Sequence, residues 1–152
     1  CIGIYPEGTI TRDIDSWPMR GKTGVARLAL KARVPIVPVA QWGAQDIIGR
    51  YEHGMHILGR KDVWVRAGEP IELTDLYDRA DDPEAWREGT DRVMDEIISM
   101  LEEIRGGIMP HEPIHSDAPD ALSKRDIAKL EAKRRMIDGP RAALRRPFQS
   151  RS

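Results

Sequence analysis

The sequence predicts an α/β domain with a mainly parallel sheet flanked by helices, followed by a flexible basic tail. Three consecutive segments carry this prediction: a β-rich stretch at residues 1–5, helical spacing of apolar residues at 22–33 and a β-branched run at 34–40. Strand, helix and strand in this order form a β-α-β unit. The two strands of such a unit are expected to be parallel, because a helix leaves enough chain for the crossover.

The first elements follow from apolar spacing and turn residues. Residues 1–5 are apolar and run directly into Pro6. This pattern predicts a buried strand and, because a domain seldom begins with a central strand, further sequence upstream. Residues 8–20 contain turn-forming residues and predict a loop. The helix that follows ends before Pro35, and this proline together with Pro38 predicts a strand at a sheet edge or bulge.

The second half of the domain contains one predicted strand and one predicted long helix. Residues 42–62 are expected to form an irregular connection, and residues 62–68 alternate at period two, which is typical of a strand. Residues 83–105 place apolar side chains along a single helical face. Asp82 is a suitable N-cap and Gly106 a suitable end, so this segment predicts a helix with both boundaries marked.

Charge divides the chain unevenly. Residues 1–122 hold 14 Lys and Arg against 22 Asp and Glu, net −8, whereas residues 123–152 hold 10 against 3, net +7. We expect residues 1–107 to form the domain and residues 108–152 a proline-containing basic tail, disordered or partly helical. Such a tail either binds an anionic surface or is simply solvated.

Composition excludes several classes of protein. With 40% hydrophobic and 32% charged residues, the chain is neither collagen-like nor wholly disordered. Cys1 is the only cysteine, so no internal disulfide is possible and a reducing compartment is expected. The sequence contains no apolar run long enough to cross a bilayer and no signal-peptide pattern. Phe148 is the only aromatic residue of the basic tail, which argues against a nucleic-acid site built on base stacking.

The segment from Ile4 to Thr9 is the most informative for chemistry. At the carboxyl end of a parallel strand, loops face the crevice where α/β proteins usually bind ligands. A glycine allows close backbone approach, a hydroxyl can donate, and cationic side chains suit a phosphate. The candidate site residues are Glu7, Gly8, Thr9, Arg12, Arg20 and Lys22. By spacing alone, Pro-Glu-Gly-Thr is equally an ordinary tight turn.

A second segment gives the first a family context. Tyr5-Pro6-Glu7-Gly8-Thr9 and Val34-Pro35-Ile36-Val37-Pro38-Val39 resemble, in order and separation, the third and fourth sequence blocks of the 1-acylglycerol-3-phosphate acyltransferase family, the lysophosphatidic acid acyltransferases. Arg20-Gly21-Lys22-Thr23-Gly24 resembles the family's element that opens the intervening helix. The stretch at residues 66–71 is similar to its late strand. The resemblance covers about residues 1–105.

The resemblance implies roles for matching positions. Glu7 and Gly8 correspond to residues that help bind the glycerol phosphate of the acceptor. Since a carboxylate repels a phosphate, Glu7 is expected to orient arginines or to accept a hydrogen bond from the acceptor hydroxyl. The family's arginine directly after the threonine is absent, and Arg12 is the candidate to replace it. Pro35, Val37 and Pro38 correspond to the block associated with acyl-donor binding, or they form a packed strand without ligand contact.

The family's catalytic block, His-x-x-x-x-Asp, lies upstream of the Pro-Glu-Gly-Thr block and supplies the general base. In this chain the same spacing occurs only at His115 and Asp120, on the other side of every other block, and we interpret it as a coincidence. We therefore expect no catalytic residue in this chain, and expect the chain alone to be inactive.

The implied activity is transfer of a fatty acyl group from an acyl thioester to a lysophospholipid or related glycerol phosphate in phospholipid synthesis. Acyl-CoA or acyl-carrier protein would be the co-substrate, with no metal or redox cofactor and no nucleic acid. The enzyme would work at a membrane surface, cytoplasmic and peripheral at the inner face. The alternative is a non-catalytic phosphate- or lipid-binding α/β module, and a His-x-x-x-x-Asp block upstream of Glu7 would favour the enzyme.

Overall fold

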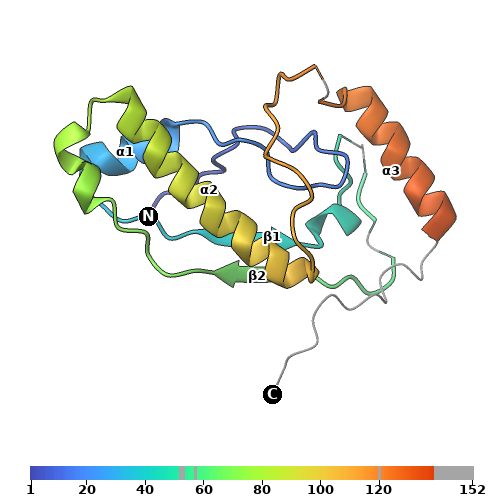
Figure 1. The fold of residues 1–152 in the computed structure, drawn as a ribbon. Helices are drawn as coiled ribbons and strands as arrows, with labels where there is room; N and C mark the ends of the chain where they lie inside the picture. Colours follow the sequence, from blue (N-terminus) through green and yellow to red (C-terminus); the bar gives the residue numbers. More distant parts are fainter. Residues whose placement is uncertain (52–53, 57, 120, 139–152) are drawn as a thin grey trace.

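The structure is a computed structural model that describes residues 1–51, 54–56, 58–119 and 121–138 (Figure 1). Two short 3-10 helices accompany the main elements, at Ala44–Asp46 and Thr74–Arg79. The main elements in chain order are α1 Gly24–Ala32, β1 Val39–Trp42, β2 Trp64–Ala67, α2 Pro83–Arg105 and α3 Lys124–Asp138.

The two strands form an antiparallel pair with one covered and one open face. Val39 lies opposite Ala67, and Trp42 lies opposite Trp64. Side chains alternate between the faces of a strand, and Ala40 is buried against α2. The other face carries Val39, Gln41, Val65 and Ala67, all exposed. We call these four residues, together with Val37, the outer sheet face.

Helix α2 lies across the covered face of the sheet and supplies most of the core (Figure 1). The predicted helix over residues 83–105 is confirmed at both ends. Asp82 accepts a hydrogen bond from the backbone of Glu84, and Gly106 ends the helix in a left-handed conformation. One apolar cluster joins α2 to the sheet and the loop before α1: Trp17, Ala40, Met100, Leu101 and Ile104.

The amino-terminal segment differs from its prediction. Residues 1–5 form no strand, and Ile2 and Tyr5 are 72% and 75% exposed. A strand needs a hydrogen-bonded neighbour, and none of the described residues pairs with this segment. The prediction of a buried strand at residues 1–5 is therefore wrong in this structure, and the β-α-β unit lacks its first strand. The mainly parallel sheet stays a prediction.

The other elements follow their patterns more closely. Helix α1 lies within residues 22–33, and β2 lies within the predicted strand at 62–68. The run at 34–40 pairs continuously only from Val39 onward, with an isolated bridge at Ile36. The two prolines explain this late start, because proline has no N–H to donate to a neighbouring strand.

The carboxyl-terminal segment forms α3. This helix contacts the connection between β1 and β2 through Arg50, and the loop before α1 through an ion pair of Arg134 with Asp15 at 3.2 Å. Ile127 is fully buried, and the Arg50 guanidinium donates to the Glu131 carboxylate at 2.5 Å in a buried ion pair. Ser123 marks the helix start, since its hydroxyl accepts a hydrogen bond from the backbone of Asp126. Helix α3 fits the partly helical alternative for this region. Of the predicted tail at residues 108–152, residues 120 and 139–152 lie outside the described residues. No helix among the described residues has the length and apolar character needed to cross a membrane.

Candidate functional site

The Pro-Glu-Gly-Thr segment forms a tight turn directly under the side chain of Lys22. The Gly8 backbone N–H donates to the Tyr5 carbonyl at 3.0 Å, and Gly8 has a φ of +66°. A Cβ at this position would lie 3.2 Å from Lys22 Cδ and 3.4 Å from its Nζ. The Lys22 backbone N–H also donates to the Pro6 carbonyl at 2.8 Å. Both the left-handed backbone and the close approach of the lysine therefore favour glycine here.

Glu7 fixes the far side of the same loop. Its Oε2 accepts the Met19 backbone N–H at 2.8 Å. Burial raises the pKa of Glu7 to about 7, although the hydrogen bond from Met19 opposes this shift. Near neutral pH this carboxyl group is therefore close to half protonated. Its observed contact is with the backbone stretch that carries Arg20 and Lys22.

Asp13 organises the middle of the loop, which sequence reasoning recognised only as a turn. Its Oδ1 accepts the backbone N–H groups of Asp15 and Trp17, at 2.9 and 3.0 Å. Its Oδ2 lies 2.9 Å from His111 Nε2, and its carbonyl accepts a hydrogen bond from Arg50 at 2.6 Å. The two backbone bonds are a local signal typical of an aspartate turn, whereas the histidine and arginine come from distant parts of the chain.

The two candidate arginines are both contacted by one segment after α2. The Arg12 Nη1 donates to the Ser116 carbonyl at 2.9 Å, and the Arg20 Nη1 lies 3.0 Å from His115 Nε2. The Arg20 backbone N–H donates to the Ile114 carbonyl at 2.9 Å. Sequence reasoning missed this contribution of residues 114–116, and no local pattern signals it. Asp120, the other half of the His-x-x-x-x-Asp spacing, lies outside the described residues.

The remaining candidate residues have different surroundings. Thr9 is partly buried on the turn, and Pro35 is exposed. Val37 is 54% exposed on the outer sheet face, whereas Pro38 is fully buried and its carbonyl accepts the Gly68 N–H at 2.9 Å. Pro38 therefore packs within the fold, and Val37 is open to a ligand or partner.

Arg105 contributes to the attachment of the loop to the core, because its guanidinium stacks on the indole rings of Trp17 and Trp42. The Arg105 guanidinium lies 3.7 Å from the centroid of the Trp17 ring and 4.2 Å from that of Trp42. It also donates to the Asp15 carbonyl at 3.0 Å. Burial between the rings lowers the pKa of Arg105. Such stacking suits a planar guanidinium, and it connects α2 to both the loop and the sheet.

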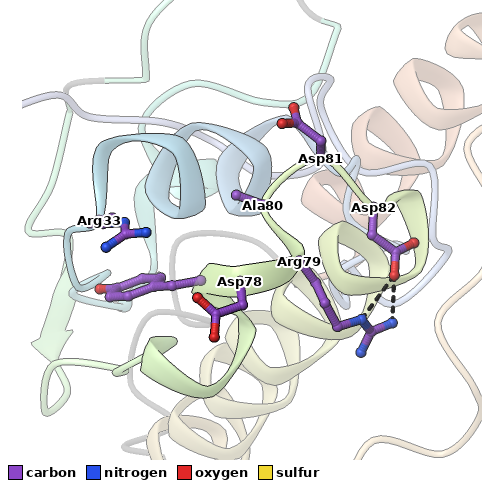
Figure 2. A pocket seen from close by; sticks show the side chains of 7 residues that line it. Arg33, Asp78, Arg79, Ala80, Asp81 and Asp82 are labelled. Atoms are coloured by element: carbon purple, nitrogen blue, oxygen red, sulfur yellow. Dashed lines mark hydrogen bonds and ion pairs between the residues drawn. The ribbon is translucent and has the colours of Figure 1, made fainter.

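A separate open pocket of about 620 Å³ lies at the end of α1 and the start of α2 (Figure 2). Arg79 donates to Asp82 at 2.7 Å on its wall, and none of the candidate loop residues lines it. Of its acidic groups, Asp82 caps α2 and pairs with Arg79, and Asp81 pairs with Lys31. Among the described residues, no three His, Cys, Asp or Glu side chains are grouped so that they could hold a metal ion.

Comparison with known proteins supports an acyltransferase relationship. Residues 1–42 match a family model described as Acyltransferase. The matched stretch contains the Pro-Glu-Gly-Thr turn, the loop with both candidate arginines, α1 and β1. No curated protein and no solved structure matches the chain. The match indicates acyl transfer as the general chemistry of this part of the chain.

Proposed function

We propose that this chain carries the acceptor-binding part of an enzyme that transfers a fatty acyl group from an acyl thioester to a lysophospholipid or related glycerol phosphate. The single observation that carries the proposal is the loop at residues 6–22. Lys22 lies over the Gly8 turn and Glu7 holds the backbone next to Arg20, within the stretch that matches the Acyltransferase family model.

In this proposal the cations bind the acceptor and Glu7 positions them. Arg12, Arg20 and Lys22 neutralise the phosphate, and arginine can do so with two parallel hydrogen bonds. Glu7 acts through its hydrogen bond with the Met19 N–H at 2.8 Å. Burial raises the pKa of Glu7 to about 7, which reduces its repulsion toward a phosphate.

The proposed chemistry needs a base that we assign to a His-x-x-x-x-Asp block outside residues 1–152. The histidine takes the proton of the acceptor hydroxyl, and the oxygen attacks the thioester carbonyl. The carbon–sulfur bond breaks as the ester forms, and the leaving thiolate takes a proton. Acyl-CoA or acyl-carrier protein supplies the acyl group, and no metal or redox group takes part. In the whole enzyme the sheet would be mainly parallel, with Pro35 and Val37 on the acyl-donor side and Pro38 packed within the fold.

We further propose that the enzyme works on the cytoplasmic side, peripheral to the inner face of the membrane, and that residues 123–152 assist through their positive charge. Each basic group near an anionic leaflet contributes on the order of 1 kcal/mol at best. Co-sedimentation with anionic and neutral vesicles, with and without residues 123–152, tests this role. Unchanged binding to anionic vesicles at low salt would contradict it.

Steady-state kinetics with each substrate varied separately test the proposed function. The 152-residue chain alone should lack acyl transfer, because a positioned base contributes about 10²–10⁴ in rate. In an enzyme that includes the His-x-x-x-x-Asp block, Gly8→Val should raise the KM for the phosphorylated acceptor far more than that for the thioester. The exposed Gly24 is free of neighbours within 4 Å at its Cβ position, so Gly24→Ala is a matched control.

Two outcomes would contradict the proposal. Normal acceptor turnover in Gly8→Val would reduce Pro-Glu-Gly-Thr to a structural turn. Phosphate or lipid binding without any turnover, even with the upstream block present, would favour the non-catalytic module.

A further inference from the structure

We propose that His115, from the segment after α2, is a further member of the phosphate-binding site and contacts the same phosphate monoester as Arg20. This inference rests on the proposed acceptor site, which it extends to a part of the chain about 95 residues away from the loop. The ligand class is a dianionic phosphate group, either on a molecule free in solution or as the headgroup of a lipid.

The first step is that hydrogen bonds hold the segment containing His115 in place beside the loop. Residues 109–116 are attached to the rest of the chain at several points along their length. Met109 N–H donates to Glu102 Oε1 at 2.8 Å, His111 Nε2 lies 2.9 Å from Asp13, and the Ile114 and Ser116 carbonyls accept hydrogen bonds from Arg20 and Arg12. The segment therefore lies beside the loop, as the neighbouring traces in Figure 1 also show.

The second step concerns the hydrogen bond between the two side chains. Arginine has only donors, so His115 Nε2 accepts in the contact with Arg20 Nη1 at 3.0 Å. An imidazole carries its N–H on either ring nitrogen. His115 can therefore donate to a phosphate oxygen that takes the place of this contact, while Arg20 donates to the same phosphate.

The third step is the charge around this contact. Arg12 also reaches the segment, and its buried Nε has no hydrogen-bond partner among the described residues. Lys22 follows Arg20 by two residues, with its side chain over the Gly8 turn. The next residue along the loop, Thr23, begins α1 without a side-chain cap, and the first turn of α1 contains no acidic residue. These features all favour an anion at the same end of the loop.

The test uses the full 152-residue chain and NMR titration with inorganic phosphate and with glycerol 3-phosphate at constant pH and ionic strength. In the wild type, the ring-proton resonances of His115 should shift as either probe is added, because the ring would contact the bound phosphate. His115→Ala should weaken binding of both probes on the order of 3- to 10-fold, the change expected for one exposed charge-assisted hydrogen bond. The affinity of His115→Gln should lie between that of the wild type and that of His115→Ala.

The matched control is His56→Gln, an exposed histidine in the connection between β1 and β2. It should leave binding unchanged. Vesicles containing phosphatidic acid, compared with vesicles containing only a phosphodiester lipid at equal charge, distinguish a lipid headgroup from free phosphate. Preference for the phosphatidic acid vesicles that is lost in His115→Ala assigns the site to the lipid headgroup, and equal binding assigns it to free phosphate.

Arg20→Ala separates this inference from the proposed function. If Arg20→Ala abolishes phosphate binding and His115→Ala leaves it unchanged, the inference fails and the acceptor site stands. If both variants bind as the wild type does, or the wild type binds no phosphate, both fail. Tighter binding by His115→Ala would also overturn the inference, because the segment would then cover the arginines and exclude the ligand.

Discussion

The loop at residues 6–22 and the outer sheet face are stabilised in opposite ways. Polar contacts from three parts of the chain hold the loop: Arg50, His111 and residues 114–116. The outer sheet face contributes apolar side chains that contact little of the described chain. Val37 and Val65 are 54% and 67% exposed.

The two regions therefore differ in whether a ligand or partner would stabilise them. The turns of the loop are held by hydrogen bonds within the chain, through Gly8, Asp13 and the Glu7 contact to Met19. The outer sheet face leaves apolar area in water, which costs about 25 cal/mol per Å² relative to burial. An acyl chain, a lipid or another protein surface would stabilise it. Four predictions test this contrast, beginning with the largest effect.

Removing the carboxylate of the buried ion pair should have the largest effect. Glu131→Ala leaves the Arg50 guanidinium buried without its partner at 2.5 Å, so we expect a loss of about 3–5 kcal/mol in the free energy of unfolding. Urea denaturation measures it. Lys129→Ala on the same helix is exposed, and its ion pair with Asp126 spans 3.9 Å, so it should change stability by less than about 0.5 kcal/mol. Equal effects in the two variants would show that α3 does not brace the loop.

Glu7→Gln should change how stability depends on pH. Burial raises the Glu7 pKa from 4.5 to about 7, so the folded state binds a proton more tightly than the unfolded state. Stability should therefore fall as pH rises between these values. Relative to Glu7→Gln, the wild type should lose about 2–3 kcal/mol between pH 5 and pH 8. Parallel profiles from urea denaturation at each pH would show that Glu7 is not buried as described.

His111 should contribute a smaller effect of the same sign. The hydrogen bond to the Glu112 carbonyl, together with Asp13 and Asp15, raises the His111 pKa. Its stabilisation is complete below the unfolded value near 6.5 and is lost as pH rises through the higher folded value. The side chain is 35% exposed, so we expect His111→Gln to cost less than about 1 kcal/mol at pH 5.5 and almost nothing at pH 8.5.

The outer sheet face should show the smallest effect. Val65→Thr keeps the shape and places a hydroxyl in solvent, so its free energy of unfolding should change by less than about 0.5 kcal/mol. Val93→Thr, at a position 2% exposed in α2, is the matched control and should cost about 1–3 kcal/mol. A similar loss in both would mean that the outer sheet face is covered in solution, for example by a second copy of the chain.

The elements predicted correctly depend on residues that are close in sequence. Helix α2 has its cap, its first proline and its terminal glycine within one continuous segment, so apolar spacing and capping chemistry specify its ends. The turn at Gly8 was predicted for the same reason. The strand at residues 1–5 was predicted from composition, but a strand also needs a neighbour, and composition does not supply one.

By itself the sequence determined α1, α2, the loop that begins at Gly8 and the acyltransferase resemblance, because each depends on short-range backbone preferences or on motif spacing. Only the tertiary structure decided that His115 reaches Arg20, that His111 reaches Asp13 and that α3 is attached through Arg50. Such contacts join segments tens of residues apart. Their formation depends on the packing of the whole chain. The local sequence does not distinguish these histidines and arginines from others of the same type, so it does not predict which of them meet.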